Sequence, residues 1–361
     1  MLSNVQVQRS VVRVRRRNTS THPVRKVDDA RKASLIKQID TMPLYDYLCY
    51  WLRNQKCGMV KPTTYDTLER VVQNYIKDTL GGIPVGQLQP EDVQGLLSRM
   101  KEIDGYSHST VKKVYDCLNA SIKYGVKRRM LPENPMDLVE MPSKNLFATT
   151  EMTFFSIKEC AFIIEEATRS YSTGRPVYLY GDAIVLILLT GIRLGEAIGL
   201  KKEDYDATKR TLKIRRNVQK VRNRDEDGNL LPGRNLQETT TKSYSGQREI
   251  PLTTQAAAAI ERMLREHPYS EYIVCSSKGA MATPEQVDRT FRYLLRNLGL
   301  SPSGVHKLRH TFASLLFAKS IDVKTISKLL GHASCAITLS TYIHIADVIP
   351  HSAVTPLDEL F

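Results

Sequence analysis

Residues 306–342 read HKLRHTFASLLFAKSIDVKTISKLLGHASCAITLSTY, and this stretch places an arginine, three histidines and a tyrosine in one short run. His306 and Arg309 are three residues apart at the start of a segment with helical periodicity, so they would share one helix face. His332 follows a Leu-Leu-Gly sequence, in which Gly331 suits the left-handed cap of a helix end. Tyr342 follows ten residues later. The stretch thus combines hydrogen-bond donors for an anion with a phenol.

A second arginine, Arg193, lies upstream, just after an apolar run at 183–189 that predicts a buried helix. Gly191, between the apolar run and Arg193, interrupts the helical pattern. An arginine at such a place is costly unless it meets an anion or a carboxylate. The alternative to an anion site is a salt bridge between Arg193 and Glu196 or Glu203.

A lysine between these segments, Lys242, is predicted to lie on a β-hairpin. Residues 211–217 and 247–252 have the patterns of strands, and the polar sequence at 225–229 predicts a turn between them. By composition alone, Lys242 is one of many surface lysines.

Guanidinium groups are suited to a phosphodiester in transfer, because each planar fork donates two parallel hydrogen bonds to the non-bridging oxygens. A phenol is a weak nucleophile with a free pKa near 10, and neighbouring cations and a base lower the cost of ionising it. His306 and His310 also have the i, i+4 spacing of a metal pair. Zinc hydrolases of that type need Glu beside the first histidine, where this chain has Lys307. We therefore expect an anion site and no metal.

The ordered pattern Arg, Lys, His-x-x-Arg, Leu-Gly-His, Thr-Tyr-x-His resembles the tyrosine recombinases, or phage integrase family, of the mobile-element type. The resemblance covers the last 200 residues or so. It implies a catalytic set of Arg193, Lys242, His306, Arg309, His332 and the nucleophile Tyr342, with Lys242 as the proton donor to the leaving 5′-oxygen.

The resemblance implies a site-specific DNA recombinase, an integrase that cleaves and rejoins DNA through a 3′-phosphotyrosyl intermediate to integrate or excise a mobile element. That intermediate stores the bond energy, so no cofactor is expected. The alternatives are an Xer-like chromosome or plasmid dimer resolvase, a type IB topoisomerase-like enzyme, and a DNA-binding protein with an inactive site. The expected partners are double-stranded DNA, further copies in a homo-tetramer on paired DNA sites, and accessory DNA-bending and directionality proteins.

The composition agrees with a polyanionic partner, since 361 residues carry a net charge of +14. A ribosome-associated or membrane-surface protein would share this charge. The chain has no run of 18 apolar residues, and its start does not read as a signal peptide, so we expect no membrane association. Six scattered cysteines suit free thiols in a reducing compartment, which predicts a cytoplasmic protein, encoded by a bacterium or a phage and associated with the nucleoid.

The predicted fold is mainly α with a small antiparallel β-sheet. Helices are expected at 43–55, 63–80, 90–102 and 107–129, and the resemblance assigns them to a helical core-binding domain that precedes a mixed α/β catalytic domain. The expected boundaries are a flexible basic arm at 1–40, the core-binding domain at 41–142, a linker at 143–153, the catalytic domain at 154–350 and a C-terminal tail helix at 351–361.

Two basic segments are the candidate DNA-binding regions. Up to residue 32 the arm has nine lysines and arginines against two aspartates, although a solvated tail would look the same. The helix at 107–129 is also strongly basic. The candidate DNA-binding residues are Arg13, Arg15, Arg16, Arg17, Lys112, Lys113, Lys123, Lys127, Arg128 and Arg129.

Overall fold

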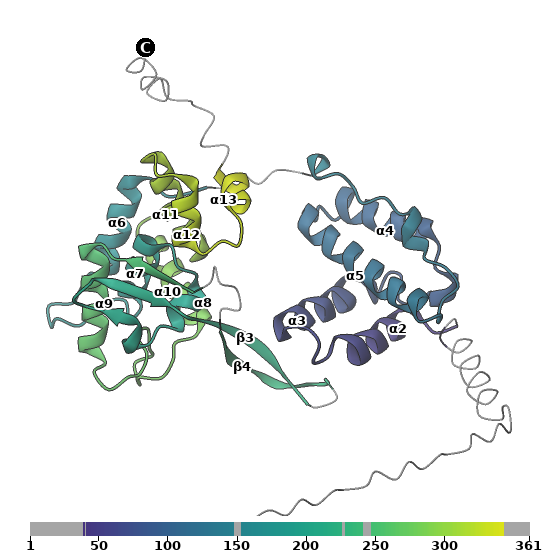
Figure 1. Cartoon of the computed structure of the whole chain (residues 1–361), viewed down its shortest axis with the longest axis horizontal. Helices are drawn as coiled ribbons and strands as arrows, with labels where there is room; N and C mark the ends of the chain where they lie inside the picture. The colour runs from purple at the N-terminus through teal and green to yellow at the C-terminus, as the bar shows by residue number, and fades with distance from the viewer. Residues whose placement is uncertain (1–38, 40, 148–152, 226–227, 241–246, 343–361) are drawn as a thin grey trace, which may run out of the picture. The chain divides into compact units, whose positions relative to one another are not determined.

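The computed structural model describes residues 39, 41–147, 153–225, 228–240 and 247–342 (Figure 1). Of the arm predicted at 1–40, only residue 39 is among these residues, and the tail predicted at 351–361 lies outside them. Packing divides the chain into two units at Ala148, within the expected linker, and residues 57–66 group with the second unit. Each unit is described by itself.

The first unit is helical, as its sequence predicts. Its helices are α2 (Leu44–Trp51), α3 (Pro62–Val71, whose first residues group with the second unit), α4 (Pro90–Glu102) and α5 (His108–Lys127). Helices α2 and α3 continue into π-helical turns at Leu52–Lys56 and Val72–Ile76, and short 3₁₀ turns lie at Val85–Gln87, Pro135–Leu138 and Lys144–Leu146. Helix α4 starts where expected because Pro90 occupies its first position and the Asp92 carboxylate accepts a 3.0 Å hydrogen bond from the Gln89 amide.

The core of the first unit is formed by the apolar faces of these helices. Leu48 and Trp51 of α2, Leu97 of α4 and Leu118 of α5 are almost fully buried. The Tyr47 hydroxyl donates a 2.7 Å hydrogen bond to the carbonyl of Ser121, which links α2 to α5. Burial raises the pKa of Tyr47. This bond satisfies a buried hydroxyl that would otherwise be costly.

The second unit is built around one buried helix, α7 (Gly181–Thr190). Six apolar residues in succession, 183–188, are buried, as expected of a helix surrounded by others. Its neighbours are α6 (Ile157–Ala167), α8 (Leu194–Ile198), α9 (Thr254–Glu266), α10 (Pro284–Asn297) and α11 (His306–Ala318). Two further helices, α12 (Val323–Leu330) and α13 (Cys335–Tyr342), complete this unit. Among the residues that the structure describes, no helix is long and apolar enough to cross a membrane.

The strands form two separate antiparallel sheets. A small sheet has the order β1 (Tyr205–Asp206), β2 (Thr211–Ile214), β5 (Arg248–Pro251), with Leu212 opposite Ile250. Between β2 and β5 the chain forms a long two-stranded ribbon, β3 (Arg216–Arg224) and β4 (Leu230–Thr240), which extends from the body of the second unit in Figure 1. The mainly helical fold with small antiparallel sheets is confirmed.

The predicted hairpin was wrong in one respect. The segment between Arg224 and Leu230 joins β3 to β4 and does not join β2 (Thr211–Ile214) to β5 (Arg248–Pro251). Strand β4 escapes sequence patterns because it is mostly exposed and contains Pro232 and Gly233, which are rare within strands. Lys242 follows β4 but lies outside the described residues.

Candidate active site

Two helix ends meet at the centre of the candidate site. Gly191 ends α7 with φ 64°, and Gly331 ends α12 with φ 66°, so both have the left-handed conformation that glycine adopts without strain. The amides of Gly331 and His332 donate to the carbonyls of Lys328 and Ser327 at 3.1 and 3.0 Å. The predicted cap at Gly331 is therefore confirmed, and the last carbonyls of α12 face other partners.

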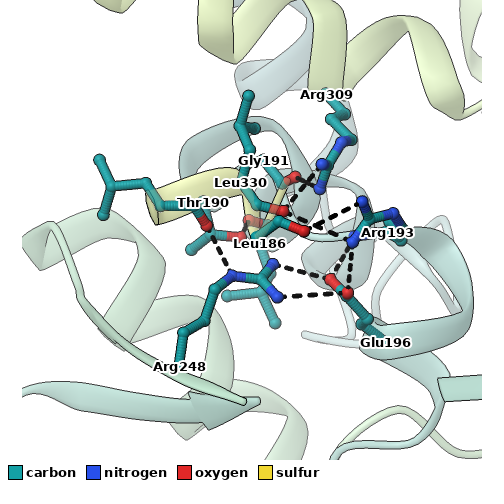
Figure 2. A network of polar contacts seen from close by, with 10 residues as sticks. Leu186, Thr190, Gly191, Arg193, Glu196, Arg248, Arg309 and Leu330 are labelled. Atoms are coloured by element: carbon teal, nitrogen blue, oxygen red, sulfur yellow. Dashed lines mark hydrogen bonds and ion pairs between the residues drawn. The ribbon is translucent and has the colours of Figure 1, made fainter. Parts of the chain in front are cut away.

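Arg309, on the first turns of α11, supplies the most buried of these partners. Its side chain is 3% exposed, and it donates 2.8 Å hydrogen bonds to the carbonyls of Gly191 and Leu330 (Figure 2). Carbonyls at a helix C-terminus carry partial negative charge and lack intrahelical donors, so a guanidinium is a favourable partner for them. Arg309 thus joins the ends of α7 and α12.

Arg193 precedes α8 and contacts the same helix end. It forms a 2.8 Å ion pair with Glu196 and makes longer contacts of 3.5 and 3.4 Å with the carbonyls of Leu330 and Gly331. The salt bridge that the sequence offered as an alternative is therefore present. The side chain of Arg193 nevertheless remains 39% exposed, so an anion in solvent can reach it.

The sequence reasoning missed two residues here, Glu196 as a site residue and Arg248. Glu196 is 2% exposed and binds Arg193 and Arg248, whose own side chain is 7% exposed. Burial alone would raise the pKa of Glu196, but hydrogen bonds and charges from Arg248 and Arg193 outweigh it and lower that pKa. Glu196 is therefore a buried carboxylate anion shared by two arginines.

The histidines lie on two sides of this cluster. His306 is the first residue of α11, its side chain is exposed, and its ring is perpendicular to that of His310 at 4.6 Å between centroids. Partial desolvation lowers the pKa of His306, and Arg309 and Arg193 lower it further. Burial, followed by the charges of His306 and Arg309, lowers the pKa of His310 to about 4. Both rings are neutral at pH 7.

His332 follows the end of α12 directly. Its Nδ1 is 2.8 Å from the Thr338 hydroxyl of α13, which is one helical turn before Tyr342. Burial, with the charges of Arg309, Arg193 and Arg248, lowers the pKa of His332 to about 4, so this ring is also neutral at pH 7. Tyr342 is the last residue of α13; the structure places its backbone but not its side chain. The structure thus brings Arg193, Arg309 and His332 together.

The candidate DNA-binding residues separate into two groups. Arg13, Arg15, Arg16 and Arg17 lie outside the described residues. The basic residues of the first unit, Lys112, Lys113, Lys123, Lys127, Arg128 and Arg129, are all exposed. Helix α5 ends at Lys127, and Arg129 has φ 58° in the following turn. Arg128 and Arg129, which were predicted to be helical, therefore lie outside the helix. Lys112 forms a 2.8 Å ion pair with Asp116 one turn along α5.

The metal interpretation gains no support from the geometry. Within the described part of the chain, no group of three His, Cys, Asp or Glu side chains could hold a metal ion. His306 and His310 contact each other through their rings.

Comparison with known proteins identifies the family. A profile of the phage integrase family matches residues 163–348, which is more than half of the chain, and a profile of the phage integrase N-terminal SAM-like domain matches residues 44–101. The chain belongs to the phage integrase family. Membership makes it an enzyme of the tyrosine recombinase type, which cleaves and rejoins DNA.

Relatives of this integrase-family chain come from several genetic contexts. It is 28% identical to a tyrosine recombinase XerC-like protein of Caldanaerobacter subterraneus subsp. tengcongensis, over 88% of this chain and 83% of that protein. It is 25% identical to the transposase from transposon Tn916 of Enterococcus faecalis, over 82% and 73%. With the integrase of Staphylococcus phage L54a the identity is 22%, over 90% and 94%.

Solved integrase structures share the fold. The Tn1549 transposon integrase in complex with a circular intermediate DNA aligns with a TM-score of 0.70 at 21% identity, covering 89% of this chain and all of that one. A lambda integrase dimer bound to a core site aligns with a TM-score of 0.62 at 17% identity, covering 83% and 95%. At these identities the likeness concerns the fold alone.

The observed arrangement suits the chemistry of a phage integrase family member. Exposed Arg193 provides donors for an anion, and the exposed, neutral imidazole of His306 can accept a proton. The hydrogen bond between Thr338 and His332 joins this anion site to α13, at whose end Tyr342 lies.

Proposed function

We propose that this chain is a mobile-element integrase in which Tyr342 attacks a DNA phosphodiester held by Arg193 and Arg309. The observation that carries the proposal is the convergence of two guanidiniums and His332 on the end of α12, one hydrogen bond away from the helix that ends in Tyr342. Guanidiniums held in place before the substrate arrives stabilise charge that develops in the transition state.

The proposed reaction is a transesterification. The Tyr342 oxygen forms a bond to phosphorus while the bond from phosphorus to the 5′-oxygen breaks, giving a 3′-phosphotyrosyl intermediate and a 5′-hydroxyl. Neutral His306 accepts the proton of the phenol, and Lys242 donates a proton to the leaving 5′-oxygen. A 5′-hydroxyl then attacks the phosphotyrosyl bond by the reverse steps, so the energy of the broken bond is conserved.

His332 has a separate role in this proposal. If the Thr338 hydroxyl donates to Nδ1, the proton of the neutral ring is on Nε2, which can donate to a non-bridging phosphate oxygen. The same hydrogen bond couples the orientation of His332 to the position of α13.

The proposed substrate is double-stranded DNA in a synapse of four copies on paired sites, formed in the bacterial cytoplasm. The basic arm and the exposed lysines of α5 would bind phosphates, and the tail at 351–361 would dock on a neighbouring copy. Accessory DNA-bending and directionality proteins would select integration or excision. Relatives include a transposase and a phage integrase, which support an element integrase, and a tyrosine recombinase XerC-like protein, which makes a dimer resolvase the second candidate.

A nicked suicide duplex carrying the element end tests the proposal. The leaving strand diffuses away after cleavage, so the covalent complex accumulates. We expect a covalent protein–DNA complex, and joining of strands from two duplexes when an intact partner is added. No covalent complex would indicate a DNA-binding protein without catalysis, and rejoining only within one duplex would indicate a topoisomerase-like enzyme.

A further inference from the structure

Arg248, at the start of β5, directs its whole guanidinium to protein acceptors. Its Nε donates to the Leu329 carbonyl at 2.7 Å, and its two terminal nitrogens contact the Glu196 carboxylate at 3.2 and 2.8 Å. Its side chain is only 7% exposed. Each of its three nitrogens therefore contacts a protein acceptor.

One acceptor of Arg248, Glu196, is also bound by the candidate catalytic residue Arg193, and the other, the Leu329 carbonyl, is next in sequence to carbonyls that Arg309 and Arg193 bind. Glu196 receives hydrogen bonds from both the backbone and the side chain of Arg193, at 2.9 and 2.8 Å. Leu329 belongs to a run of three carbonyls at the end of α12, and each accepts from a guanidinium. Arg248 binds Leu329, Arg309 binds Leu330, and Arg193 makes the longer contact with Gly331.

This run of carbonyls directly precedes His332 in the chain. After a left-handed glycine the helix has no further intrahelical donors for its last carbonyls, so the three arginines provide them. Arg248 also joins β5 to α8 and α12, which are 52 and 81 residues away in the sequence.

We propose that Arg248 is a positioning residue for the cleavage reaction. By holding Glu196 and the Leu329 carbonyl at once, it fixes the orientation of Arg193 and the position of His332 against the scissile phosphate. The inference rests on the proposed function of this site.

The substitution Arg248→Lys distinguishes the effect of the positive charge from the effect of the guanidinium geometry. An ammonium keeps the positive charge beside Glu196, but a single nitrogen cannot reproduce the planar fork to a carboxylate and a third bond to a carbonyl. A displacement of about 1 Å in a catalytic group can cost about 10²-fold in rate. Arg248→Lys should therefore reduce the rate at saturating DNA by about that factor, with little change in Kd.

The experiment compares full-length variants in single-turnover cleavage of the nicked suicide duplex, with Kd and the thermal midpoint measured in parallel. The matched control is Arg262→Lys, because Arg262 forms a similar fork with Asp182 at 2.5 to 3.1 Å, away from the site. We expect the control to cleave at the wild-type rate.

A second variant keeps the test valid if Arg248→Lys folds poorly. Glu196→Gln combined with Arg248→Met leaves no buried charge without a partner. Because the effect of Arg248 on Arg193 passes through Glu196, the two losses should overlap, and we expect the rate of the double variant to be within about threefold of that of Glu196→Gln alone.

Three results would overturn the inference while the proposed function stands. These are wild-type cleavage by Arg248→Lys, a loss confined to Kd with a normal rate at saturation, and multiplicative losses in the double variant. A wild-type protein that cleaves no site would overturn the proposed function, and the inference with it.

Discussion

Arg309 of the second unit and Lys123 of the first carry the same charge in opposite surroundings. Arg309 is 3% exposed and bound to two backbone carbonyls, whereas Lys123 is exposed on α5. Lys112, Lys123 and Lys127 share one side of α5, since 11 and 4 residues are close to whole helical turns. The first environment holds a cation in one orientation by hydrogen bonds, and the second leaves cations exposed to solvent.

This contrast separates two ways of using positive charge. A buried, hydrogen-bonded guanidinium is already oriented when substrate arrives. Its contribution to transition-state stabilisation depends on the direction of its N–H donors, so a side chain of the same charge but another shape does not replace it. Exposed lysines act as point charges whose contributions are small, distributed and screened by salt. Substitutions in the two regions should therefore affect different quantities.

The largest effect is expected at the arginine cluster. Arg309→Lys and Arg193→Lys keep the charge but lose the planar fork, and each should reduce the cleavage rate by roughly 10²–10³-fold, as for loss of one oxyanion-hole donor. Single-turnover cleavage at saturating DNA measures this. Rates within a few-fold of wild type would reduce these arginines to structural ion-pair partners.

A smaller effect concerns the pH dependence of stability near the cluster. An unfolded histidine takes up a proton below about pH 6.5, whereas His310 and His332 in the native protein do so only below about pH 4. Between these values the unfolded state binds more protons, so stability falls as the pH is lowered.

His310→Gln removes one of these groups and tests the sign. Between pH 7.5 and 5 the thermal midpoint of wild type should fall by several degrees more than that of His310→Gln. The difference in thermal midpoint between wild type and His310→Gln should therefore become smaller as the pH is lowered. A gap that stays constant with pH would mean that His310 titrates with its ordinary pKa.

The smallest effect is expected on α5. Replacing Lys123 and Lys127 by alanine should weaken DNA binding and lower the log–log salt slope by about 0.9 for each phosphate that the protein no longer neutralises. Cleavage at saturating DNA should not change. Lys112→Ala is the matched control, with a weaker effect because Lys112 is already paired with Asp116. An unchanged slope in the double variant would show that this face is only solvated.

The parts of the site that could be predicted are those with local causes. Gly331 ends α12 because a left-handed residue is needed there, and Pro90 starts α4 because proline suits the first helical position. The ion pair between Arg193 and Glu196 spans three residues, so it was visible as an alternative.

The parts that escaped prediction depend on contacts between distant residues. Arg248 meets Glu196 and Leu329 only after β5, α8 and α12 have packed together, and nothing in the sequence around Arg248 marks those partners. The ribbon of β3 and β4 was missed for a different reason. Most of its second strand is exposed and polar, so it lacks the alternating apolar pattern by which strands are recognised.

The most direct test of the account is to identify the residue joined to DNA. Wild type and Tyr342→Phe are incubated with the nicked suicide duplex, and the covalent peptide is mapped by mass spectrometry. We predict that Tyr342 carries the 3′-phosphate, that the released strand has a 5′-hydroxyl, and that Tyr342→Phe binds DNA with near-normal affinity but forms no adduct. An adduct that persists in Tyr342→Phe, or that maps to another residue, would contradict the account.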